Sequence, residues 1–146
     1  MHVKVQLDEG AFMPERAHET DAGADLRTPE PFMVPPFSSA IIHTGVHVET
    51  PTNCVTLVKA KSGLNVKQDI TTTGVVDEGY SGEIIVKLYN NGPIRRYFEK
   101  GDKIAQILIM PVYYPPFVKV NKISSGERGD AGFGSTENKQ LDIFDA

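Results

Sequence analysis

The segment GVVDEGYSGEIIVKLYN, residues 74–90, indicates the architecture of the chain, because it predicts two extended segments joined by a tight polar turn. Its second half has the period of two that a half-buried strand requires. The residues of the inward face are Ile84, Val86 and Leu88. The turn holds two glycines, which tolerate the backbone angles that close a hairpin. It also carries Asp77 and Tyr80, which no turn requires, and these two are the first candidates for function.

The composition predicts one globular domain. The chain has 146 residues, of which 40% are hydrophobic and 23% charged. A net charge of -4 argues against general nucleic-acid binding, which depends on neutralising many phosphates. The single cysteine, Cys54, lies in an apolar run and has no partner for an intrachain disulfide, so a buried thiol and a reducing, cytoplasmic setting are expected.

The hydropathy of the sequence predicts neither a signal peptide nor a membrane-spanning helix. Residues 1–10 alternate apolar and polar side chains and lack the apolar run of a signal peptide. The most apolar stretch, residues 104–112, is far shorter than the ~20 residues of a spanning helix and is predicted to be a core strand.

Short strands separated by turn residues predict an all-β fold, a distorted jelly roll or β-sandwich barrel. The expected strands cover residues 3–7, 39–50, 54–61, 84–90, 104–110 and 117–120, and one short helix begins at Ser62, which is placed to cap it. His43 and His47 are expected to face solvent from one face of the second of these strands. Residues 1–123 form the predicted core.

The remaining residues, 124–146, are rich in glycine, serine and charge and are expected to form a mobile arm. A glycine-rich run follows Arg128 and contains Phe133, so a guanidinium, backbone amides and an aromatic face can meet one ligand, with phosphate plus base the obvious fit. The alternative is a flexible tail. A P-loop is excluded because its lysine and its flanking strand and helix are missing. Leu141, Ile143 and Phe144 either dock on a neighbouring subunit or belong to a frayed end.

Six positions in the core carry chemistry of interest. Lys61, Ser62 and Gly63 place a cation and a hydroxyl at a helix start, although solvated lysines are common at strand ends. Asp25 and Gln106 also have purely structural interpretations. Asp25 fits a turn residue, and Gln106 fits a strand residue whose side chain pairs with the backbone. Asp77 either orients and deprotonates a water or stabilises its turn.

Five segments in this order resemble the five motifs of the trimeric dUTP diphosphatase (dUTPase) family. They are AGADL, KSGLN, GVVDEGYSGEIIVKLYN, GDKIAQILI and RGDAGFGST, and they span residues 22–136. The resemblance implies a jelly-roll homotrimer, with active sites at subunit interfaces, that uses Mg2+ to hydrolyse dUTP to dUMP and diphosphate. This reaction limits uracil incorporation into DNA and supplies dUMP for dTMP synthesis.

The resemblance also implies roles for single residues. Asp77 is similar to the residue that activates the water attacking the α-phosphorus, Tyr80 to the ring beneath the deoxyribose, and Asp25 to the acid that holds metal-bound waters. The backbone positions that resemble the uracil reader are Gly74, Val75, Val76 and Ile85. Cytosine there would leave buried groups unpaired, at about 1 to 3 kcal/mol each.

The implied triphosphate contacts come from the helix start, a strand and the arm. Their residues are Lys61, Ser62, Gly63, Gln106, Arg128, Gly134 and Ser135, and Phe133 is similar to the ring that covers the uracil as the arm closes over the site. Lys61 stands where most members carry an arginine, so a bidentate contact is in doubt at that position.

Two alternatives to this function stay open. A dCTP deaminase shares the fold, but such relatives carry a catalytic glutamate where Lys87 stands and lack the equivalent of Asp77. A regulatory or structural module, as in a phage, could keep the nucleotide site as a switch. Neither nucleic acid nor membrane is an expected partner.

Overall fold

The structure is a computed structural model that describes residues 1–136, and residues 137–146, with Leu141, Ile143 and Phe144, lie outside the described part. The chain divides into two compact units, Met1–Tyr114 and Pro115–Ala146. The compact core therefore ends earlier than the predicted boundary after residue 123. Closure of an arm over the core stays a prediction.

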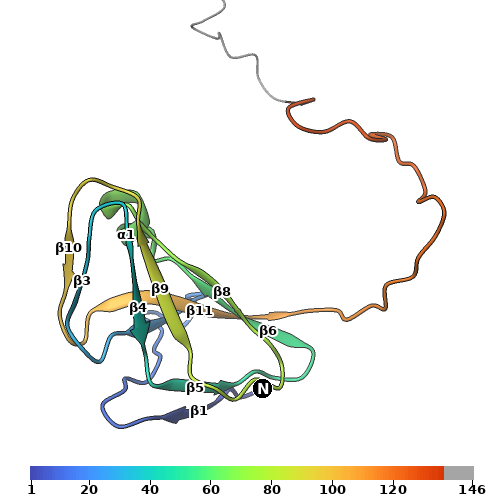
Figure 1. Ribbon diagram of the computed structural model, residues 1–146. Coiled ribbons are helices and arrows are strands. Elements are labelled where there is room, and N and C mark those ends of the chain that lie inside the picture. Colours follow the sequence, from blue (N-terminus) through green and yellow to red (C-terminus); the bar gives the residue numbers. More distant parts are fainter. Residues whose placement is uncertain (137–146) are drawn as a thin grey trace, which may run out of the picture. The chain divides into compact units, whose positions relative to one another are not determined.

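The first unit is built almost entirely of strands (Figure 1). In chain order the elements are β1 Lys4–Leu7, β2 Ala24–Arg27, β3 Phe32–Val34, β4 Ser39–His43, β5 Val46–Glu49, β6 Cys54–Lys59, α1 Ser62–Gln68, β7 Ile70–Thr71, β8 Thr73–Val76, β9 Ile85–Asn90, β10 Arg96–Phe98 and β11 Lys103–Pro111. The predicted all-β class with one short helix is confirmed.

The strands form small antiparallel sheets that share one core. A four-stranded sheet has the order β2-β11-β6-β8, and a three-stranded sheet has the order β4-β9-β7. Two further pairs, β1-β5 and β10-β3, complete the unit. The fully buried apolar side chains come from both of the larger sheets and include Leu26, Leu88 and Ile104.

The alternation predicted for β9 is confirmed. Its burial changes at every residue, with Val86, Leu88 and Asn90 inside and Ile85, Lys87 and Tyr89 outside. The predicted hairpin, however, is not a paired ladder, because β8 pairs with β6 while β9 pairs with β4 and β7. The turn between them leads from one sheet into the other, and the amide of Ile84 donates to the carbonyl of Val46 where β9 begins (2.8 Å).

The strand predicted over residues 39–50 is broken into two. Gly45 has a φ of 68°, which an extended strand cannot include. The hydroxyl of the buried Thr44 donates to the carbonyl of Ile84 (2.5 Å), so the break is held from inside. As a result His43 ends β4 and His47 lies in β5, and the prediction that they share one strand face is wrong.

Three other local predictions need correction. Residues 117–120 form no strand, because a strand needs a hydrogen-bonded neighbour and none is present in the part of the chain that the structure describes. The sequence does not predict β3 or β10, because prolines and turn residues surround them. The two strands pair with each other, and Phe32 stacks on Phe98 with ring centroids 4.7 Å apart. Lys61, not Ser62, is the N-cap of α1, with no side-chain capping bond.

We expect Asn90→Ala to destabilise the core, because the buried Asn90 amide serves three backbone groups. It donates to the carbonyls of Ile94 (2.7 Å) and Val34 (3.3 Å) and accepts from the amide of Gly92 (3.0 Å). Each buried group left unpaired costs about 1 to 3 kcal/mol. Urea unfolding should show this loss, and Asn91→Ala, which removes the exposed neighbouring amide, should unfold close to the native midpoint.

Candidate functional site

The turn after β8 presents Asp77 and Tyr80 in one fixed arrangement. The amide of Tyr80 donates to the carbonyl of Asp77 (3.1 Å), and the Tyr80 hydroxyl donates to the carbonyl of Glu83 (2.9 Å). A Cβ on Gly82 would lie 2.3 Å from the Tyr80 hydroxyl oxygen. Gly82 therefore lets the ring lie against the backbone, and the turn predicted from its glycines is built around the tyrosine.

A cavity of about 220 Å3 lies beside this turn, between the two diverging strands. Its lining residues are Val58, Gly74, Val75, Val76, Asp77, Tyr80, Glu83, Ile84 and Ile85. β8 pairs on one side only, with β6, so its other edge keeps main-chain groups for a ligand. The structure thus brings together Asp77, Tyr80 and all four backbone positions that the sequence suggested for base recognition.

A second group of polar residues crosses the four-stranded sheet. Asp25 on β2 lies opposite Gln106 on β11, which in turn lies opposite Lys59 on β6. Directly opposed residues on neighbouring strands point to the same face, with strands about 4.8 Å apart. Motif residues that are distant in sequence therefore lie side by side at this end of the sheet.

Asp25 is almost completely buried and is held by two lysines. Its Oδ1 pairs with Lys61 Nζ and its Oδ2 with Lys103 Nζ (3.0 Å). Burial raises the pKa of the Asp25 carboxyl, but hydrogen bonds and charge from Lys61 and Lys103 outweigh it, so the pKa lies below its usual range. The carboxylate is ionised and charge-compensated.

Gln106 is held next to this ion-paired group. Its side-chain amide donates to the carbonyl of Ala60 (2.9 Å), which directs the amide towards the chain just before Lys61. A Cβ on Gly23 would lie 2.0 Å from Gln106 Oε1, so glycine is required there. The sequence analysis did not single out Gly23 or Lys103. Gly23 lies in the quoted segment AGADL, and Lys103 lies in the quoted segment GDKIAQILI.

Within the first unit the predicted site residues form two separate groups. Asp25, Lys61 and Gln106 lie together, with Ser62 and Gly63 exposed at the start of α1, and none of the five lines the cavity that contains Asp77 and Tyr80. The four remaining predicted site residues belong to the second unit and are Arg128, Phe133, Gly134 and Ser135.

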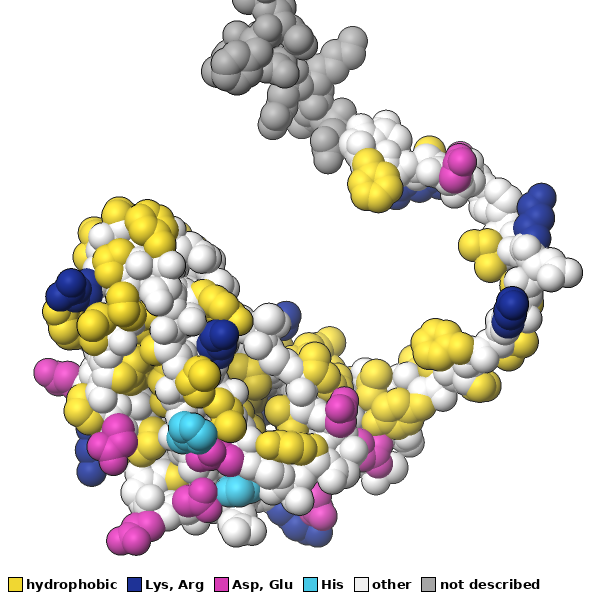
Figure 2. Space-filling model, in the orientation of Figure 1, with side chains coloured by type: hydrophobic (Ala, Val, Ile, Leu, Met, Phe, Trp, Pro, Cys, Tyr) yellow, Lys and Arg dark blue, Asp and Glu magenta, His cyan; other side chains and the backbone are white. Residues whose placement is uncertain are grey.

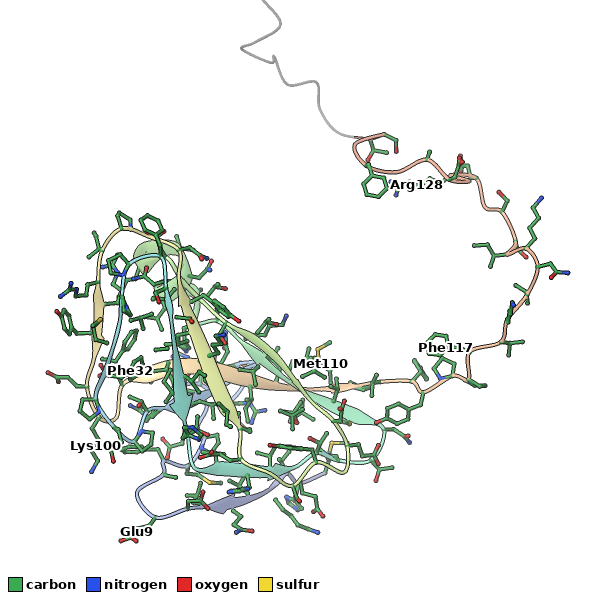
Figure 3. All side chains as sticks on the ribbon, in the orientation of Figure 1. Glu9, Phe32, Lys100, Met110, Phe117 and Arg128 are labelled. Carbon is green, nitrogen blue, oxygen red and sulfur yellow. The ribbon has the colours of Figure 1, made fainter. Side chains whose placement is uncertain are left out.

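The second unit contains short turns. Arg128 Nε donates to the carbonyl of Ala131 (2.7 Å), and the amide of Ser135 donates to the carbonyl of Gly132 (3.3 Å). Phe133 and Gly134 both have positive φ, 49° and 95°. The Phe133 ring is fully exposed, and Figure 3 marks Arg128 on the same unit. This loop offers an aromatic ring and backbone amides without packing of its own.

Two histidines contact the turn from β4 and β5. His43 Nδ1 lies 2.7 Å from Glu83 Oε1, while Glu83 Oε2 accepts from the amide of Gly45 (2.9 Å). His47 Nδ1 lies 2.9 Å from the carbonyl of Ser81, and His47 Nε2 lies 3.1 Å from Asp8 Oδ1. Figure 2 shows histidine and acidic side chains adjacent on this face.

His43 is exposed, as predicted, and His47 is half-buried and held by the Ser81 carbonyl and by Asp8. A carbonyl on one ring nitrogen and a carboxylate near the other both require N–H donors, so the protonated imidazole fits this position. The hydrogen bond to the Ser81 carbonyl, and then that to Asp8, raises the pKa of His47 above its ordinary value of 6.5.

Side chains that commonly bind metals do not cluster in the described part of the chain. In residues 1–136 the structure contains no group of three or more His, Cys, Asp or Glu side chains that could hold a metal ion. Within the same residues no helix is long and apolar enough to cross a membrane.

Comparison with known proteins gives a consistent result along the chain. A family model described as dUTPase matches residues 9–137. The deoxyuridine 5'-triphosphate nucleotidohydrolase of Clostridioides difficile is 40% identical over 134 residues, which are 90% of this chain and 94% of that protein. The enzyme of the same name from Alkaliphilus metalliredigens is 42% identical over 139 residues, 92% of this chain and 96% of that protein.

Solved structures show the same relationship. The dUTPase of Staphylococcus bacteriophage 80alpha, described with dUPNHPP, has a TM-score of 0.83 and 32% identity, covering 92% of this chain and 98% of that one. A mutant dUTPase from phage phi11 of S. aureus, described with a structural Mg(II) ion, has a TM-score of 0.79 and 29% identity, covering 86% of this chain and 100% of that one. The neighbours are jelly-roll β proteins, which confirms the predicted fold class.

We expect the stabilising effect of His47 to depend on pH. Because its folded pKa is raised, its contribution to stability is complete below the ordinary value of 6.5 and is lost as the pH rises through the folded value. The difference in melting temperature between the native chain and His47→Gln should therefore shrink from about pH 6 to about pH 8.5. His2→Gln, at the exposed N-terminus, serves as control, and a His47→Gln difference that stays constant over this range would contradict the expectation.

Proposed function

The chain belongs to the dUTPase family and hydrolyses dUTP to dUMP, and we propose that Asp77 carries this reaction by activating the water that attacks the α-phosphorus. The observation that carries the proposal is the separation of β8 and β9, which opens a cavity of about 220 Å3 with Asp77 and Tyr80 in its wall. Uracil recognition and the general base Asp77 would then share one rigid element. Diphosphate is the second product.

Uracil would be read by the main chain of this cavity. The backbone near Gly74, Val75, Val76 and Ile85 offers donors and acceptors in fixed positions, because β8 and β9 are each held by other strands. Cytosine presents a partly reversed pattern, and each buried group left unpaired would cost about 1 to 3 kcal/mol. The methyl group of thymine would meet the wall of a small cavity.

Tyr80 would lie beneath the deoxyribose and exclude ribose. Its hydroxyl is fixed on the carbonyl of Glu83, and the missing side chain of Gly82 lets the ring lie close to the backbone. A ring held in this way cannot yield to a 2'-hydroxyl without losing its hydrogen bond. Discrimination against UTP would therefore come from shape.

The triphosphate would be bound by residues outside this cavity. The proposed contacts from the core are Lys61, Ser62, Gly63 and Gln106, and those from the second unit are Arg128, Gly134 and Ser135, with Phe133 covering the uracil. Lys61 gives a point charge where most family members have an arginine fork. Closure of the second unit would keep bulk water from the reaction.

We place the complete site at the interfaces of a homotrimer. In one chain the group around Asp25 and the cavity around Asp77 have different lining residues, and the second unit is a separate compact body. A site made from several copies accounts for this division. Exposed apolar residues such as Val75, Ile85 and Met110 fit contact with other copies. We also propose that the enzyme acts in the cytoplasm.

Asp25 is the residue that would hold Mg2+ through bound water. A lone buried carboxylate beside two lysines does not fit an all-protein metal cage, but it fits Mg2+ that arrives on the triphosphate and keeps most of its waters. When bound, Mg2+ would offset phosphate charge and favour departure of diphosphate. Asp25 would orient the hydrated triphosphate, while Lys61 and Lys103 keep the carboxylate ionised.

We expect Asp77→Asn to abolish turnover while dUTP binding is retained. The amide keeps the shape of the carboxylate but cannot accept the proton of the attacking water, and loss of a general base lowers kcat about 10²- to 10⁴-fold. Release of diphosphate from dUTP with Mg2+ measures the rate, and calorimetry with a non-hydrolysable analogue measures binding.

Two controls accompany this measurement. Glu9→Gln removes one negative charge from the loop that follows β1 (Figure 3) and should leave the rate unchanged. The substrates dCTP, dTTP and UTP should be hydrolysed far more slowly than dUTP. Equal turnover by Asp77→Asn would end its assignment, and preferential deamination of dCTP would point to the deaminase relatives.

A further inference from the structure

The carboxylate that follows Asp77 in the chain is fixed by two groups from outside the turn. Glu78 Oε2 accepts a hydrogen bond from the amide of Asn53 (3.0 Å) and one from the hydroxyl of Tyr114 (2.7 Å). The same hydroxyl lies 3.3 Å from the carbonyl of Cys54. Glu78 is therefore tied to the turn before β6 and to the end of the compact core.

The segment after β11 is itself fixed to the same place. The amide of Val112 donates to the carbonyl of Asn53 (2.9 Å), so Asn53 binds Val112 through its carbonyl and Glu78 through its amide. Asn53 has a φ of 60°, the left-handed conformation that Asn adopts more readily than most residues. Three chain segments thus meet at one carboxylate next to Asp77.

Asp77 lies between two cavities. It lines the cavity of about 220 Å3 with Tyr80, and it also lines a larger one of about 730 Å3. The larger cavity is bordered by Cys54, Val55, Val75, Asp77, Glu78, Gly79, Val112 and Tyr114. Movement of the wall formed by Glu78 and Tyr114 would therefore move the backbone that carries Asp77.

The charge states of Glu78 and Tyr114, both exposed side chains, favour the hydrogen bond between them. The bond to Glu78, followed by burial, raises the pKa of Tyr114 from its ordinary value of 10.0 to about 12. The Tyr114 hydroxyl and then the Asn53 amide lower the pKa of Glu78. Tyr114 stays a donor and Glu78 an ionised acceptor throughout the neutral range, and such charge-assisted bonds are among the stronger ones.

We propose that Tyr114 and Glu78 are positioning residues for Asp77, acting by holding the turn in the geometry that places the Asp77 carboxylate on the attacking water. The inference rests on the proposed role of Asp77. Neither side chain needs to touch the substrate. A shift of about 1 Å in a reacting group is enough to slow an enzyme strongly, so one hydrogen bond at this point affects the chemical step.

The test is Tyr114→Phe, which removes one oxygen and keeps the ring. We expect kcat for dUTP to fall about three- to tenfold, the effect of losing one hydrogen bond to a charged group, with KM within about twofold of the native value. Tyr113→Phe is the matched control, because Tyr113 is the adjacent tyrosine and is 91% exposed. It should behave as the native chain. All rates are compared well below the melting temperature of each variant.

Variants at Glu78 separate positioning from a general loss of structure. Glu78→Gln keeps an oxygen acceptor and should retain most of the native kcat, whereas Glu78→Ala, which also removes the bond from the Asn53 amide, should be at least as slow as Tyr114→Phe. The double variant of Glu78→Ala and Tyr114→Phe should be no slower than Glu78→Ala, because Glu78→Ala has already removed the bond to Tyr114. In Glu78→Ala the Tyr114 hydroxyl should titrate at a lower pH than in the native chain by ultraviolet absorbance, because the bond to Glu78 is the largest cause of its raised pKa.

The outcomes that contradict the inference are distinct from failure of the proposed function. A native chain without dUTP hydrolysis would overturn the function itself. A native chain that is active, with Tyr114→Phe equal to Tyr113→Phe in kcat, would overturn only the positioning role. Additive losses in the double variant, or a change confined to KM, would overturn it as well.

Discussion

The geometry of the site follows from the separation of β8 and β9 into two different sheets. Consecutive antiparallel strands commonly pair as a hairpin, and pairing would close the space between them. Here β6 holds β8 in one sheet while β4 and β7 hold β9 in another. The free edge of β8 leaves main-chain donors and acceptors available to a ligand in the cavity.

The buried charge of Asp25 imposes a second constraint. An ionised carboxylate in this position would be strongly unfavourable without partners, and Lys61 and Lys103 provide them from two different elements. The antiparallel order β2-β11-β6 puts Asp25, Gln106 and the chain leading to Lys61 at one end of a sheet. The sheet therefore builds a polar, cation-bearing surface from segments far apart in sequence, and such a surface suits a triphosphate with its Mg2+.

The turn that carries Asp77 and Tyr80 is held on both sides by carboxylates. Glu83 reaches β4 and the β4–β5 connection through His43 and Gly45, and Glu78 reaches the opposite side through Asn53 and Tyr114. An exposed turn with only its own hydrogen bonds would sample several arrangements. Contacts to separate parts of the core reduce that freedom and fix the positions of Asp77 and Tyr80.

The all-β class, the inward face of β9 and the identity of the turn could be predicted from the sequence, because period-two alternation and glycine-bearing turns are local properties. The order of the five motif segments also indicated the family. The sequence did not predict that β8 and β9 join different sheets, that β3 pairs with β10, or that residues 117–120 form no strand, because pairing depends on partners distant in the chain. The same reason explains Lys103, Gly23 and Tyr114: each matters through a neighbour that no spacing in the sequence reveals.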